Sequence, residues 1–173
     1  MKRLLTPKYL TEEVAQRAVN HALSSAFVSF SELMKRRHCH IVVLVQAMED
    51  AREAEYPNWP NYPTEAYALY QRSVAKEDWE HPYDKIAMCK ALQLWTDRNT
   101  DGRTSSVPHL LFPSDTPWWG GAKREGIVVA CSGVQPHFDQ MISNLTIDVM
   151  VALAHDAYEN DDERKKPGTD FLT

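Results

Sequence analysis

The residues best suited to binding a ligand gather in one unusual stretch, 112–121. Its two prolines and its glycine pair, Gly120 and Gly121, predict an irregular loop, and the adjacent indoles of Trp118 and Trp119 give that loop a large aromatic surface. One interpretation is that the two indoles fill the core or an oligomer interface. The other is that they form the wall of an apolar pocket for a planar or aromatic ligand, with Asp115 and glycine N–H groups as polar contacts.

Four side chains in or near this loop have the chemistry of general acids and bases. Asp115 lies inside the loop, His109 precedes it, and His137 and Asp139 follow it at the start of a predicted helix. Imidazoles and carboxylates are the groups that most often move protons in active sites. We therefore take these four residues as candidate catalytic residues.

Composition narrows the class of protein. The chain has 173 residues, of which 43% are hydrophobic, and this suits one folded domain over 1–158 with a charged tail over 159–173. A net charge of −5 argues against nucleic acid as the main partner. The apolar runs are too short to cross a membrane, and the N-terminal residues do not resemble a signal peptide, so we expect a cytoplasmic protein.

Hydrophobic periodicity predicts the elements that must position these residues. The predicted order is helix, two strands, helix, strand or strands, helix. The first helix is capped by Thr11 and carries residues 35–37 at its C-terminal end. The strands are expected at 40–46, 65–72 and 126–133, the second helix at 83–95, and the last helix from 136 onward. This order favours an α+β domain with a central antiparallel sheet and flanking helices. Segment 49–63 is rich in charges and prolines and predicts a loop insertion. Its aromatic residues offer an alternative function as a docking surface for a protein partner.

Three segments carry a family resemblance. Leu69-Tyr70-Gln71-Arg72 resembles a strand ending in aromatic-x-Arg, and Ile86-Ala87-Met88-Cys89-Lys90-Ala91 resembles a Leu-Ala-x-Asp-Lys-Ala helix. Gly120-Gly121, the strand 126–133 ending in Ser-Gly, Pro136 and Asp139 resemble a Gly-Gly, strand, Ser-Gly, Pro-x-x-Asp finish. Together they resemble the HbpS/GlcG family, also known as the haem-degrading or PduO C-terminal-like family, from about His40 to Ala154.

The sequence also departs from that family. Cys89 stands where the family usually has Asp, segment 49–63 replaces a tight hairpin, and segment 112–121 replaces a short link before the closing strands. These differences indicate a divergent subgroup with its own ligand.

The resemblance implies a profilin-like α+β fold and homo-oligomers, dimers or larger. It implies that Arg72 and Lys90 hold a carboxylate, a role for which paired N–H donors suit Arg, and it places Ser132 with the ligand-binding candidates. The alternative for the two cations is structural: they cap the last helix turn or pair with Asp139 at a subunit contact.

Two functional hypotheses follow. The first is a small-molecule-binding protein of the HbpS/GlcG type that holds haem, or another planar ligand, near Trp118 and Trp119. Its iron ligand would be one of four imidazoles, since imidazole is the usual haem donor, namely His40, His81, His109 or His137. The second is a small enzyme acting on an aromatic or short organic acid, without haem.

Overall fold

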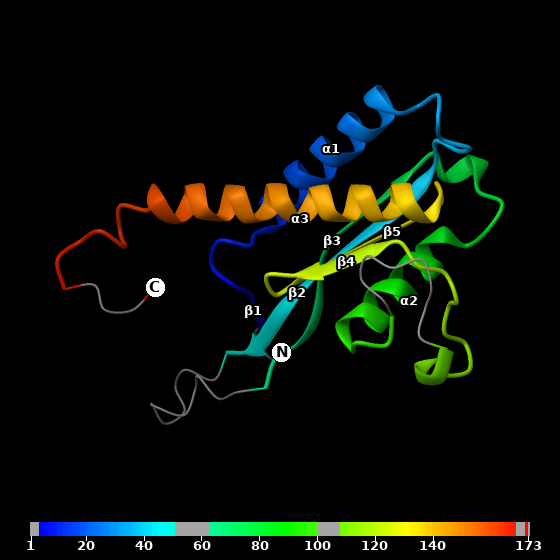
Figure 1. Cartoon of the computed structure of the whole chain (residues 1–173). Helices are drawn as coiled ribbons and strands as arrows, with labels where there is room; N and C mark the ends of the chain where they lie inside the picture. The colour runs from blue at the N-terminus through cyan, green and yellow to red at the C-terminus, as the bar shows by residue number, and fades with distance from the viewer. Residues whose placement is uncertain (1–3, 51–62, 100–107, 169–171, 173) are drawn as a thin grey trace.

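The computed structural model describes residues 4–50, 63–99, 108–168 and 172. It shows a five-stranded antiparallel sheet flanked by three α-helices, which confirms the predicted α+β class and agrees with a profilin-like arrangement (Figure 1). Most of the predicted insertion 49–63 lies outside the described residues. The α-helices and strands follow one another as β1 (Leu4–Leu5), α1 (Glu12–Ser29), β2 (Cys39–Glu49), β3 (Glu65–Val74), α2 (Tyr83–Trp95), β4 (Gly121–Arg124), β5 (Ile127–Ser132) and α3 (Pro136–Glu159).

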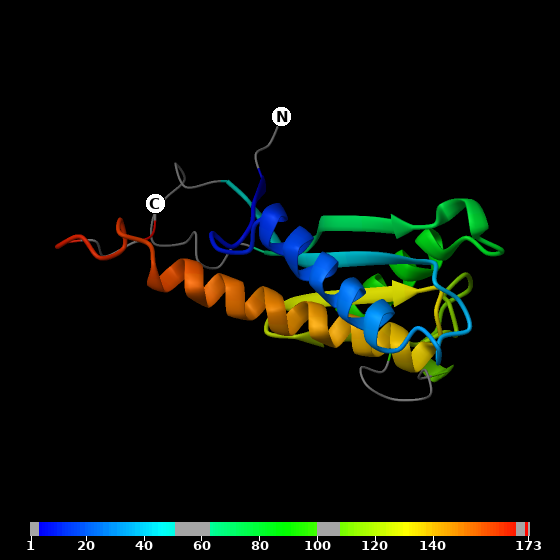
Figure 2. The same cartoon turned by 90° about the horizontal axis from the view of Figure 1, so that it is seen from above.

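The sheet is built around β2. This strand pairs with β3 along most of its length and with β5 on its other side, and β5 pairs in turn with β4. The short β1 pairs with the last residues of β2, Met48 and Glu49. Figure 2 shows β3, β2 and β5 running side by side. β2 is almost wholly apolar because it is buried on both faces, as its run of β-branched residues predicts.

The two faces of β2 are covered by different helices. Ile41, Val43 and Val45 belong to the core that contains the buried residues of α1 and α3. Val42 and Leu44 alternate with them and pack with α2 on the opposite face. In Figure 1, α1 and α3 accordingly lie above the sheet and α2 lies below it. Residues next to each other on a strand therefore point to different helices.

The helix boundaries follow local signals with one exception. Thr11 caps α1 by accepting a hydrogen bond from the Val14 N–H (3.2 Å), and α3 begins with Pro136 in its first turn, both as predicted. The first helix, however, ends at Ser29 instead of near residue 35. Leu33, which we expected on its apolar face, is 59% exposed, so a longer helix would bury nothing there.

The sequence left open a further strand before 126–133 but gave no range for it, and β4 is that strand. We expected an irregular loop up to Gly121, but residues 121–124 pair with β5 across a tight turn. Both residues of that turn, Glu125 and Gly126, have positive φ values of 54° and 73°. Such a turn matches the twist of the strands, but Asn-Gly or Asp-Gly is its usual sequence signal, and here the pair is Glu-Gly.

The charged tail is attached to the N-terminal segment through Asp161. Its Oδ2 accepts a hydrogen bond from the Tyr9 hydroxyl (2.8 Å) and lies 3.0 Å from Lys8 Nζ. These hydrogen bonds lower the pKa of Asp161 from 3.8 to about 2, and the one from Lys8 has the largest effect. The contact is therefore expected at neutral pH, and it is lost as the pH falls from 3.8 through about 2.

An acid titration followed by NMR tests this attachment. The Tyr9 ring packs edge-on against Tyr158 at 5.6 Å, so its signals report the contact. We expect them to move with a midpoint near pH 2, and to lose that transition in Asp161→Asn but not in the control Asp156→Asn. A midpoint near 3.8 would show that the carboxylate has no such partner.

Candidate functional site

A pocket of about 410 Å³ lies between the start of α2, the turn from β5 to α3, and the loop that carries Trp118. We call it the α2–α3 pocket. It brings together four of the predicted catalytic and ligand-binding residues, Lys90, Trp118, Ser132 and Asp139, and one of the predicted iron ligands, His81. The remaining lining residues are Lys35, Arg36, Pro82, Tyr83, Ile86, Gly133, Val134, Gln135 and Pro136.

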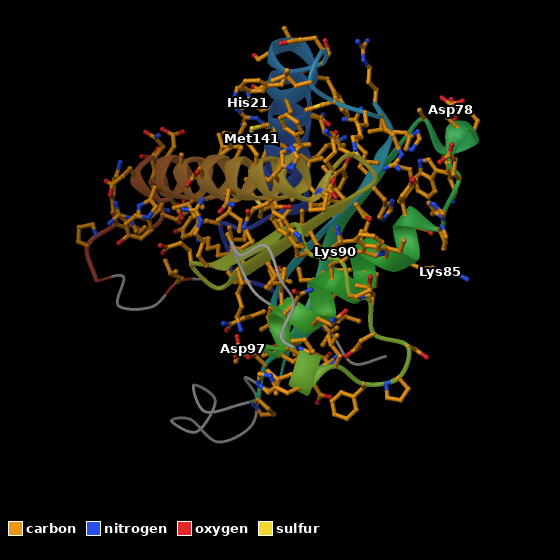
Figure 3. All side chains as sticks on the ribbon, turned by 45° about the vertical axis from the view of Figure 1, so that its right-hand side comes forward. His21, Asp78, Lys85, Lys90, Asp97 and Met141 are labelled. Atoms are coloured by element: carbon orange, nitrogen blue, oxygen red, sulfur yellow. The ribbon has the colours of Figure 1, made fainter. Side chains whose placement is uncertain are left out.

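A buried ion pair lies at one side of this pocket. Lys90 Nζ is 3.3 Å from Asp139 Oδ2 and donates a hydrogen bond to the Cys131 carbonyl oxygen (2.9 Å). Asp139 Oδ1 accepts a hydrogen bond from the Val134 N–H (3.1 Å). Both side chains are almost completely buried. In Figure 3, Lys90 lies between α2 and the sheet, whereas Lys85 on the same helix points outward. The pair therefore fixes the β5–α3 turn against α2.

Burial controls the protonation of this cluster. It raises the pKa of Asp139, while the neighbouring Lys90 opposes that shift. It also raises the pKa of the Cys131 thiol well above its usual range, and contact with Cys39 adds to the effect. Cys131 thus stays a protonated thiol at neutral pH and is unsuited to act as a nucleophile.

Aromatic rings line the side of the pocket formed by α2. The Tyr83 ring packs against His38, Trp79 and His81, with centroid separations of 5.2, 5.7 and 5.8 Å. The Trp118 indole also lines the pocket, and it is 58% exposed. A large indole left this exposed beside a hollow offers a flat apolar surface to a ligand.

The loop that carries Trp118 is held in place by polar contacts with α2. Thr116 N–H donates to Gln93 Oε1 (3.0 Å), and Gln93 Nε2 donates back to the Thr116 carbonyl oxygen (3.1 Å). Gly120 then passes so close to α3 that a Cβ atom would lie 2.7 Å from the Cβ of Asp139. The predicted Gly120 thus serves the site as a close-packing residue.

The sequence did not predict that two further cations, Lys35 and Arg36, line the pocket. We interpreted Lys35 and Arg36 only as charges favoured at the C-terminal end of a helix, but the helix ends earlier and the chain turns toward α3. Arg36 Nη1 donates to the carbonyl oxygens of Gly133 and Val134 (3.4 and 3.2 Å), which brings it to the pocket. No local motif indicates this long-range contact.

Arg72 and Lys90 do not face a shared hollow. Arg72 on β3 pairs with Ile41, whose face of the sheet is covered by α1, and its guanidinium hydrogen-bonds to Asn20 of that helix. Lys90 belongs to α2 on the opposite face. The pair therefore cannot hold one carboxylate. Arg72 has a structural contact, but it is neither of the two that we expected, because its partner is Asn20 in the middle of α1. For Lys90, the pairing with Asp139 occurs within the chain.

Other candidate residues lie outside the residues that line the α2–α3 pocket. Asp115 pairs with Arg98 and accepts a hydrogen bond from the Phe112 N–H (2.8 Å), so it holds its own loop together. His109 and His137 are exposed, and neither lines the pocket. Their imidazoles are therefore not placed to act on a molecule bound there.

Trp119 and Gly121, the second indole and the second glycine of the loop, do not contribute to the α2–α3 pocket. Trp119 is half-buried and does not line the pocket, so only one of the paired indoles faces it. Gly121 begins β4, where a Cβ atom would lie 2.4 Å from Leu94 Cδ1. It provides space for the packing of α2, not a contact to a ligand.

A larger groove of about 640 Å³ lies beside the end of α3, away from the predicted site residues. Tyr9, Ile127, Val151 and Tyr158 are among the side chains that line it. It contains none of our candidate residues. We keep it as the competing binding location for the experiments below.

Two kinds of feature were not found among the described residues, a cluster of metal ligands and a membrane-spanning helix. Within residues 4–50, 63–99, 108–168 and 172, no group of three or more His, Cys, Asp or Glu residues is arranged to hold a metal ion. None of the described helices combines the length and the apolar character needed to span a membrane.

Comparisons with known proteins add no relative. No protein-family model matches the chain, and neither the curated proteins nor the solved structures gave a match. The resemblance to the HbpS/GlcG family therefore stays a prediction, and the arguments about function rest on the geometry of the α2–α3 pocket.

Proposed function

We propose that the protein is a small-molecule-binding protein of the HbpS/GlcG type, and that it holds a planar ligand in the α2–α3 pocket. One observation carries this proposal: a hollow of about 410 Å³ combines the exposed face of Trp118 with the ring of Tyr83 and the cations Lys35 and Arg36. Ligand sites are concave, largely apolar and supplied with a few convergent polar groups, which describes this combination.

Haem is the first ligand to test, because the pocket contains the kinds of donor that it needs. His81 is the one imidazole among the lining residues, and Lys35 and Arg36 would pair with propionate groups. Haem bound there would supply an iron centre and a coloured chromophore. The other predicted iron ligands fit less well, since both ring nitrogens of His40 already contact Ser73 and Gln71.

A hemin titration tests this proposal. We expect the Soret band to shift and to saturate at one hemin per chain, and the shift to change in His81→Ala but not in His137→Ala. His137 is a matched control because it is an exposed imidazole that does not line the pocket. A saturating shift that is identical in both variants would contradict haem binding at this site.

A second binding experiment uses aromatic ligands that contain no iron. Removal of the stacking surface in Trp118→Ala is expected to weaken binding of such ligands by about tenfold, since an aromatic pair contributes about 0.5–1.5 kcal/mol beyond its buried area. Phe112→Ala is the control, because Phe112 is exposed on the same loop but packs on Arg98 outside the pocket. Binding that is equal in both variants, or absent from the wild type for every planar molecule tried, would contradict the proposed function.

The buried Lys90–Asp139 pair supports a second candidate, a small enzyme acting on an aromatic or short organic acid. A carboxyl group whose pKa is raised by burial can exchange a proton closer to neutral pH than a free one. Incubating such acids with the protein and following them by NMR tests this idea. A product that Asp139→Asn no longer forms, although the variant is folded, supports an enzyme, and no conversion of any acid contradicts it.

We also propose that the protein is cytoplasmic and that it self-associates. β3 lies at an edge of the described sheet and presents ten residues, a surface on which a second copy could pair. Sedimentation at micromolar concentration is expected to show a dimer or a larger homo-oligomer. A monomer at every concentration would contradict this part.

A further inference from the structure

Two cations that line the α2–α3 pocket have no carboxylate partner among the described residues. Arg36 donates to backbone carbonyl groups instead, and Lys35 forms no ion pair with any residue that the structure places. The third cation of the pocket, Lys90, is balanced by Asp139. The lining therefore carries an excess of positive charge, which favours an anionic ligand.

The N-terminal end of α3 opens onto the same pocket. Residues 133–136 line it, and α3 is 24 residues long. The N-cap residue, Gln135, does not cap the helix: its Oε1 accepts from the Lys35 N–H (2.9 Å) and its Nε2 donates to the Leu33 carbonyl oxygen (3.1 Å). The helix dipole is positive at this end, which favours an anion nearby. Pro136 has no N–H group, and His137 and Phe138, which follow it in the first turn, do not line the pocket, so the dipole is the contribution that α3 makes.

An independent observation comes from the side chain of Tyr83. This residue lines the pocket and is 4% exposed, yet its hydroxyl group is buried and has no hydrogen-bond partner among the described residues. Nε2 of His38, whose ring packs on Tyr83, is likewise buried and has no hydrogen-bond partner among the described residues. A buried polar group without a partner destabilises the folded state, so folded proteins rarely leave one unpaired.

We propose that these groups form a subsite for a carboxylate, and that the molecule held in the α2–α3 pocket is a small aromatic acid. This rests on the proposed function and names its ligand class. Lys35 and Arg36 supply charge, the Tyr83 hydroxyl donates a hydrogen bond to a carboxylate oxygen, and the aromatic ring packs on Trp118. Haem propionates would use the same subsite.

A matched pair of probes tests the subsite with the intact chain. 2-Naphthoate and 2-naphthamide have the same ring and nearly the same shape, but only the first is an anion at pH 7. We expect calorimetry to give naphthoate at least about tenfold higher affinity, with a preference that shrinks as salt is added. Equal affinities would overturn the carboxylate subsite and leave the proposed function intact. Failure of both probes to bind would overturn the small aromatic acid as the ligand, and the hemin titration then decides the proposed function.

Single variants locate the subsite within the pocket. Tyr83→Phe removes one hydroxyl oxygen, so it should weaken naphthoate by about tenfold and leave the melting temperature equal or higher. Naphthamide should be weakened less, because its carbonyl oxygen is an uncharged acceptor. Lys35→Gln should lower the affinity for naphthoate but not the affinity for naphthamide. Lys85→Gln is its control, because Lys85 is an exposed lysine on α2 that points away from the sheet (Figure 3). Wild-type affinity for naphthoate in both Tyr83→Phe and Lys35→Gln would overturn the proposal.

Discussion

Replacing Lys90 with Met is expected to lower the free energy of unfolding by about 3–5 kcal/mol at pH 7, because the change leaves a buried carboxylate without its cation. Lys90 and Asp139 are 2% and 3% exposed, so solvent cannot replace the lost partner. The loss should shrink in acid. The pKa of Asp139 is already raised by burial and rises further without Lys90, so the folded variant gains stability as the pH falls toward 3.8 and the carboxyl becomes neutral.

Urea unfolding at pH 7 and at pH 5 measures both effects, and a double variant serves as the control. Lys90→Met combined with Asp139→Asn removes both charges and keeps an oxygen that can accept the Val134 N–H. We expect the double variant to recover most of the lost stability, as replacements of whole buried ion pairs often do. A loss below about 1 kcal/mol in Lys90→Met would place the pair in the class of exposed salt bridges and contradict its buried position.

Gly120→Ala is expected to have the second large effect on stability. Gly120 has a φ of +112°, and a Cβ atom there would lie 2.7 Å from Asp139 Cβ and 2.8 Å from the Pro136 carbonyl oxygen. Strained backbone and overpacking each cost about 1–3 kcal/mol, so we expect a total loss of about 2–6 kcal/mol in urea unfolding. Since Gly120 follows the Trp118 loop, the folded fraction should also bind hemin or naphthoate more weakly.

Gly126→Ala separates backbone strain from steric overlap. Gly126 also has a positive φ, but the nearest atom to an added Cβ is the end of the flexible Gln46 side chain at 3.6 Å. This control should cost about 1–2 kcal/mol and leave ligand binding unchanged. Equal losses in the two variants would show that the close approach of Gly120 to α3 contributes nothing.

Much of the fold was predictable because its signals are local. The predicted helix 83–95 coincides with α2, and the β-branched run at 40–46 lies inside β2. Thr11 and Pro136 marked two helix starts, since capping and φ restriction act within a few residues. The exceptions were also local: an unusual Glu-Gly turn concealed β4, and the apolar spacing continued past the real end of α1.

The site was only partly predictable because it is assembled from distant segments. Lys90, Trp118, Ser132 and Asp139 were expected together, and they line one pocket. The face of β3 that holds Arg72 could not be assigned without the register of the sheet.

The missed residues show the same limit. Lys35 and Arg36 reach the pocket only because the chain after α1 meets the β5–α3 turn, roughly a hundred residues later. Tyr83 lines the pocket from the start of α2. The missing partner of the Tyr83 hydroxyl exists only in three dimensions.

The location of bound 2-naphthoate tests the account most directly. Amide and indole NMR signals of the intact protein, recorded as naphthoate is added, report which residues meet the ligand. We predict shifts in the Trp118 indole N–H and in the amides of Tyr83, Gly133 and Val134, all of which line the α2–α3 pocket. Shifts confined instead to Tyr9, Val151 and Tyr158, in the groove beside the end of α3, or no shifts at all, would contradict it.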